Sequence, residues 1–178
     1  MKAKRIGMTL VIVILLFGMI PGTADGEQKE KGYRARVRLS VIAAERIHRQ
    51  IMDFMAIDLK KLGDVILTDK NFDWHLAVTG VELLTAEGKR TGVAISTVIM
   101  EPVPEPVVRS IITVLEKEGS TPAALEALKS KQLVEVKSSW LRADTDTAIR
   151  QLCRGIIADF DAQYLQPERM KDQRRHQQ

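Results

Sequence analysis

The most restrictive feature of this 178-residue sequence is an alternation of large apolar residues that begins at residue 72. The alternating residues are Phe72, Trp74, Leu76 and Val78. Side chains two positions apart lie on the same face of a β-strand, so this segment is predicted to be a strand with one buried face. The parity of the apolar positions changes after Gly80, which predicts a β-bulge at this glycine.

The polar residues 85–90 include Gly88, which can adopt the positive φ of a turn. Residues 91–100 are rich in Val, Ile and Thr, which favours a second strand. Together these segments predict a long antiparallel hairpin whose apolar face must be covered by other parts of the chain.

The rest of the chain supplies both strands and helices. Alternation or β-branched residues predict strands over 33–41, 64–69 and 133–140. Apolar residues at three- and four-residue spacing predict helices over 43–62, from Pro106 to Gly119, after Pro122, and from Asp144 or Asp146 through Tyr164. The predicted order is β-α-β-β-β-α-α-β-α. It indicates an α+β fold: a two-layer sandwich with a mixed, mostly antiparallel sheet of about five strands and helices on one face.

The chain is predicted to contain a single folded domain over 33–166. Residues 1–24 have the layout of a signal peptide: basic residues, an apolar run of 15 residues from Ile6 to Ile20, and small residues ending at Ala24. An uncleaved membrane anchor is the alternative, although spanning helices usually need ~20 apolar residues. Residues 25–32 are expected to be a flexible lead, and the polar residues 167–178 a disordered basic tail.

The net charge of +4 comes from the two ends of the chain. Residues 1–24 contain three bases and no acids, and the tail contains four bases and two acids, so the body is close to neutral. The basic character is therefore no argument for a nucleic-acid-binding domain. Cys153 is the only cysteine, which excludes an intrachain disulfide.

An arginine stripe is the one surface feature of the sequence that suggests a function. Arg34, Arg36 and Arg38 alternate with apolar residues in the first predicted strand, so they should project from its solvent face. Arginines in this arrangement can bind carboxylates, phosphates or anionic lipid headgroups. The alternative is a solvated face, or charges that protect an edge strand from unwanted pairing.

The sequence contains no recognisable catalytic motif. It has no G-x-S-x-G, P-loop, H-E-x-x-H or G-x-G-x-x-G pattern. Cys153 lies within the apolar stripe of the last helix, where a thiol is typically a small buried hydrophobe. His48 has no second histidine at ligand spacing. We therefore predict no catalytic residue, no metal site and no cofactor, although a paired-carboxylate site could be assembled from distant residues.

Two short segments resemble a pattern found in exported bacterial proteins. Residues 61–65 (KLGDV) end a helix in Leu-Gly before a short strand, and residues 73–78 (DWHLAV) begin the next hairpin with an Asp-aromatic-x-Leu-x-Val strand. This pattern is similar to domains of envelope-assembly and transport-auxiliary proteins, including the curli-export lipoprotein and the N-terminal domain of TolB. The resemblance implies a periplasmic, non-catalytic domain that binds another envelope component, and it transfers no binding residue.

The hypothesis that follows is an exported interaction module. It would be periplasmic or secreted after cleavage near Ala24, or anchored in the inner membrane if the segment is retained. Its partner would be an envelope protein or an anionic lipid. The alternatives are a small hydrolase or isomerase without a recognisable motif, and a structural homo-oligomer formed through a sheet edge.

Overall fold

The computed structural model describes residues 32–130, 132–145 and 148–178. The predicted signal peptide over 1–24 and nearly all of the flexible lead therefore lie outside the described residues. The elements follow one another as β1 (Ala35–Ala43), α1 (Glu45–Lys61), β2 (Val65–Leu67), β3 (Trp74–Leu84), β4 (Arg90–Pro102), α2 (Glu105–Lys117), α3 (Pro122–Ser130), β5 (Val134–Asp144), α4 (Ile149–Phe160), a π-helical turn η2 (Asp161–Leu165) and α5 (Gln166–His176).

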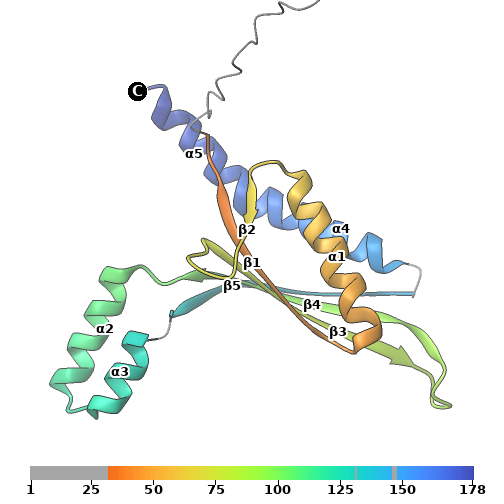
Figure 1. Cartoon of the computed structure of the whole chain (residues 1–178), viewed down its shortest axis with the longest axis horizontal. Coiled ribbons are helices and arrows are strands. Elements are labelled where there is room, and N and C mark those ends of the chain that lie inside the picture. The colour runs from red at the N-terminus through yellow and green to blue at the C-terminus, as the bar shows by residue number, and fades with distance from the viewer. Residues whose placement is uncertain (1–31, 131, 146–147) are drawn as a thin grey trace, which may run out of the picture. The chain divides into compact units, whose positions relative to one another are not determined.

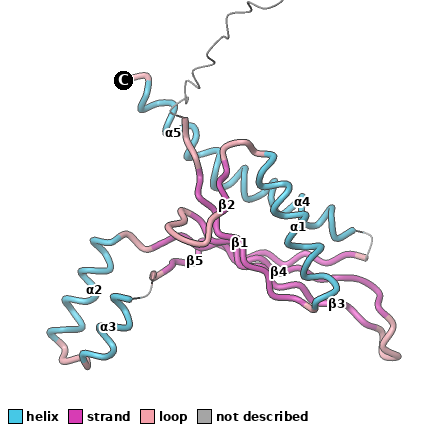
Figure 2. The backbone as a smooth tube through the Cα atoms, in the orientation of Figure 1, coloured by secondary structure: helices cyan, strands magenta, loops and turns pink. Residues whose placement is uncertain are grey.

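The strands form one five-stranded sheet in the order β2-β1-β3-β4-β5. β1 runs parallel to both of its neighbours, β2 and β3, whereas β4 is antiparallel to both β3 and β5. The predicted α+β architecture with a mixed sheet of about five strands is confirmed. Figure 1 shows α1 and α4 on the same side of the strands, and Figure 2 separates the helices from the strands by colour.

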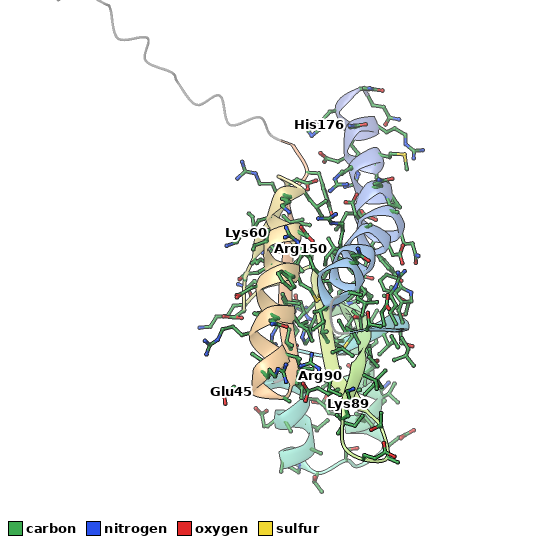
Figure 3. All side chains as sticks on the ribbon, turned by 90° about the vertical axis from the view of Figure 1, so that its right-hand side faces the viewer. Glu45, Lys60, Lys89, Arg90, Arg150 and His176 are labelled. Carbon is green, nitrogen blue, oxygen red and sulfur yellow. The ribbon has the colours of Figure 1, made fainter. Side chains whose placement is uncertain are left out.

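The core lies between the sheet and the pair α1 and α4. One face of β1, β3 and β4 contributes buried apolar side chains, and the apolar stripes of α1 and α4 cover them. Figure 3 labels Glu45 and Lys60 near the two ends of α1, with Arg150 on the neighbouring α4. The largest fully buried side chains include Phe160, Ile47, Ile51, Met55, Leu59, Leu76, Ile95, Ile99 and Ile156.

Gly80 does not form the predicted bulge. The pairing of β3 with β4 continues through Gly80, and its register shifts only between Leu83 and Leu84. A Cβ at Gly80 would lie 2.5 Å from the Cδ1 atom of Ile51, so the glycine allows α1 to approach the sheet closely. Because the register does not change, Val81 remains on the face opposite to the core.

Two further segments differ from the sequence-based expectation. An apolar stripe at helical spacing normally marks a buried face, yet α2 has no buried residue. The tail forms α5, with its residues following η2 without a break, where disorder was expected. Arg169 holds α5 in place: its guanidinium donates hydrogen bonds to Asp64, with an Nη2–Oδ1 distance of 2.8 Å, and to Asp161 at 2.6 Å.

Candidate functional site

The face of the sheet opposite to α1 and α4 is the candidate site, and we call it the open face. The strand register shows which residues belong to this face, because residues paired across neighbouring strands form a row and point to the same side of the sheet. Its members are Ile66 of β2; Arg36, Arg38, Ser40 and Ile42 of β1; His75, Ala77, Thr79, Val81 and Leu83 of β3; Gly92, Ala94, Ser96, Val98 and Met100 of β4; and Val136, Ser139, Leu141 and Ala143 of β5.

Apolar side chains dominate the open face, and several of them are accessible to solvent. Ile42 is 73% exposed and Leu141 is 74% exposed, at the two ends of one row across four strands. Val136 is 60% exposed and Val81 is 51% exposed. Thr79 and Ser96 lie between Ile42 and Leu141 in this row. Single exposed apolar residues are ordinary, but several of them on different strands of one sheet face are typical of an interaction surface.

The arginines of the sequence-based prediction lie at one end of this face, in different environments. Arg34 is exposed and precedes β1, so it is not part of the strand. Arg36 forms an ion pair with Asp73 at 2.7 Å, and its backbone N–H donates to the same carboxylate at 2.8 Å. Hydrogen bonding to Asp73 and its negative charge raise the pKa of Arg36. The three arginines therefore do not form a uniform stripe.

Arg38 belongs to a second small cluster with an aromatic and a histidine. Its guanidinium lies 5.7 Å from the ring centroid of Phe72, a cation–π contact. The ring of His75 also lies beside Phe72, at 5.4 Å between centroids, and its Nε2 atom is 2.7 Å from the hydroxyl of Ser40. Burial, followed by the charge of Arg38, lowers the pKa of His75, so this histidine is neutral near pH 7. The end of the open face thus offers a cation and hydrogen-bonding groups beside apolar surface.

The sequence indicated the arginines but not the open face that extends beyond them. The signal was the change of apolar parity at Gly80, which we interpreted as a bulge. If the strand continues through Gly80 without a bulge, Val81 and Leu83 lie on its solvent face. Apolar residues at the solvent-facing positions of a strand therefore indicate a second apolar surface, and this signal is visible in the sequence.

A cavity of about 500 Å³ lies on the other side of the sheet, beside α1 and α4. Its lining residues are Asp58, Lys61, Leu62, Arg154, Ile157, Ala158, Asp161 and Gln166. Asp58 is buried; its Oδ1 atom accepts a hydrogen bond from Lys61 at 2.6 Å, and its Oδ2 atom has no partner among the described residues. The lining has charges of both signs but no histidine, cysteine or hydroxyl nucleophile, so it does not form a recognisable catalytic group.

The remaining candidates for chemistry are separate from each other. Cys153 is fully buried, and burial, followed by the charge of Asp58, raises the pKa of its thiol to about 12. His75 lines neither the cavity described above nor a smaller one of about 260 Å³ beside Leu39 and Met52. Within 32–130, 132–145 and 148–178, no group of three or more His, Cys, Asp or Glu residues could hold a metal ion. None of the helices in this described part has the length and apolar character to cross a membrane.

Comparisons with known proteins give little further information. No protein-family model matches the sequence, and no curated protein matches it. Among solved structures, the chain is similar to a dodecamer of a PelC point variant from Paraburkholderia phytofirmans, with 8% identity and a TM-score of 0.37 over 70% of this chain and 84% of that one. A likeness this distant carries no functional argument.

Proposed function

We propose that this protein is an exported, non-catalytic interaction module that binds a protein of the cell envelope through the open face. The observation that carries the proposal is the set of exposed apolar side chains, represented by Ile42 and Leu141, on a sheet face that no described helix or strand covers. Export rests on the layout of residues 1–24.

The composition of the open face resembles that of a protein interface. Interfaces combine a desolvated apolar centre with a polar rim that fixes orientation. On this face, Ile42, Val81 and Leu141 supply the apolar part, and Arg38 with His75 supplies a polar end. Burial of the apolar part would drive association, and the arginine would favour a partner with a carboxylate at the matching position.

The same face favours a protein partner over an anionic lipid surface. Arg36 is already paired with Asp73, so its charge is largely compensated. Adsorption to anionic lipids depends on several uncompensated cations, each contributing about 1 kcal/mol. The open face has more apolar side chains than uncompensated cations. This composition therefore favours burial against a complementary protein surface over adsorption to anionic lipids.

The test is affinity purification of the exported protein from cell envelope. The double variant Ile42→Glu/Leu141→Glu changes two highly exposed positions and should remove the bound partner without a large change in melting temperature. Ile57→Glu is the matched control, because Ile57 is an exposed apolar residue on α1 and lies outside the open face. Recovery of the same partner by the double variant and by the control would refute the proposal.

The contribution of the arginines can be tested separately. Replacing Arg34, Arg36 and Arg38 by Gln should weaken the recovered complex while changing stability little, since exposed ion pairs contribute ~0–1 kcal/mol. Unchanged recovery would show that the polar end of the open face is only solvated.

A further inference from the structure

A second apolar surface lies on α2. Val107, Ile111 and Val114 are spaced by four and three residues, so they form one line along the helix, and all three are exposed. An amphipathic helix of this kind normally buries its apolar face against a core. Here the helix has its apolar line but no buried residue.

The connections of α2 and α3 place this helix pair beyond the end of its own sheet. Two residues separate the end of β4 at Pro102 from the start of α2, and Pro104 restricts the backbone between them. The backbone N–H of Val103 donates to the carbonyl of Leu133 at 2.9 Å, which continues the pairing of β4 with β5 up to the base of the pair. Figure 1 shows α2 and α3 beyond the end of β4 and β5, away from α1 and α4.

We infer that the partner bound on the open face is a second copy of this chain, which contributes its α2–α3 hairpin. The inference rests on the proposed function, because it names the occupant of the same surface. Each copy holds both halves of the contact: a sheet face that no described element covers, and an exposed apolar line on α2. The two surfaces are chemically matched, since both expose apolar side chains and both have charged residues nearby.

The architecture of the covered face supports a helical occupant. Two helices, α1 and α4, cover that face of the sheet. The apolar face of a sheet generally packs against a second layer of secondary structure. The α2–α3 hairpin is also a two-helix unit, with helices of 13 and 9 residues. It could therefore cover part of the open face of a neighbour in the same way.

The size of the surface and its charge are consistent with a stable contact. The strands place roughly 20 residues on the open face, the number that a standard interface of ~800 Å² per partner uses. Residues 105–130 contain four carboxylates and three cations, whereas the positive charge left on the strands of the open face is that of Arg38, because Arg36 is paired with Asp73. Opposite net charge favours association of the hairpin with the arginine end.

This contact uses two different surfaces, so it is heterologous. A heterologous contact leaves one free sheet face and one free hairpin on every pair, and association continues until a ring closes or a filament forms. The chain is therefore expected to form species larger than a dimer. A face-to-face pairing of two sheets would instead stop at a dimer.

The test uses complementary variants of the purified full chain in sedimentation velocity. The sheet variant is Ile42→Glu/Leu141→Glu, and the hairpin variant is Ile111→Glu/Val114→Glu. Each should weaken self-association by ~30-fold or more, as expected for a charge placed in an apolar interface centre. An equimolar mixture should form a one-to-one complex, since one variant keeps an intact hairpin and the other an intact sheet face.

Three controls keep the result interpretable. Ile57→Glu should assemble like the wild type. Circular dichroism and melting temperature should match the wild type for all variants. Ile42→Thr/Leu141→Thr, which keeps strand propensity, replaces the sheet variant if the glutamates prevent folding.

Self-association of the hairpin variant at wild-type strength would overturn the inference, as would a wild-type chain that stays monomeric at all micromolar concentrations. A monomeric wild type whose sheet variant loses its envelope partner would overturn the inference and leave the proposed function standing. A sheet variant that changes neither self-association nor partner recovery would refute both.

Discussion

Cys153 provides a sensitive probe of the packing between α1 and α4. The thiol is fully buried, and because this is the only cysteine, every labelling event reports on one site. Burial raises the pKa of the thiol from 9.0 to about 12, with the charge of Asp58 as the second cause. The thiolate is the reactive form, so both protonation and inaccessibility should protect this residue.

The size of the protection can be worked out at pH 8. A thiol with its ordinary pKa is ~10% ionised at this pH, whereas one with the raised pKa is ~0.01% ionised, so protonation alone slows labelling by ~1,000-fold. Exclusion of the reagent adds to this factor, and labelling should then require unfolding. We expect the rate with an aromatic disulfide reagent to rise with denaturant in parallel with the unfolded fraction.

The control is Met170→Cys in a Cys153→Ala background, which moves the single thiol to an exposed position on α5. This variant should label at the rate of a model peptide. Labelling of native wild type at a similar rate would refute the buried placement of Cys153 and reopen a nucleophilic or redox role.

The same pKa predicts a loss of stability at alkaline pH. A pKa that is higher in the folded state gives a stabilising contribution that is complete below pH 9 and is lost as the pH rises toward 12. At pH 10 the linkage relation gives a loss of ~1.4 kcal/mol, because the unfolded thiol is largely ionised and the folded one is not. Chemical denaturation of wild type and Cys153→Ala at pH 8 and pH 10 isolates this term, and equal pH dependence in the two proteins would contradict it.

Other single positions give the remaining predictions. Gly80→Val should lower the free energy of unfolding by ~1–3 kcal/mol in urea denaturation, since the new side chain meets Ile51; an unchanged midpoint would mean that α1 can shift. Arg169→Met should increase amide exchange over 166–176, because it removes the hydrogen bonds to Asp64 and Asp161; unchanged exchange would show that α5 is held by other contacts. N-terminal sequencing of the cell-derived protein should begin at or near Asp25, and an intact Met1 in the membrane fraction would favour the anchor.

The sequence by itself determined most of the helices and strands, from β1 to α4, and the covered half of the domain, but not α5. The alternation from Phe72 to Val78 predicted a strand at β3 and identified its buried face. The apolar stripe from Ile149 to Phe160 predicted the helix α4. These patterns are local: a strand or helix needs one continuous apolar face, and its period can be read from neighbouring positions. The same helical pattern predicted that Cys153 is buried, because a small side chain within the apolar stripe of a helix does not reach solvent.

The tertiary structure decided which apolar surfaces are covered and which charges are paired. Arg36 meets Asp73, 37 residues away, and Arg169 meets Asp64, 105 residues away, so neither ion pair leaves a mark in a local pattern. The apolar line of α2 has the periodicity of a buried face. Periodicity shows that one face of a helix is apolar, but it does not show whether another element packs against that face. The change of parity at Gly80 is the clearest case: the sequence contained the apolar residues of the open face, but only the register of β3 against β4 showed that they lie on the far side of the sheet from α1 and α4.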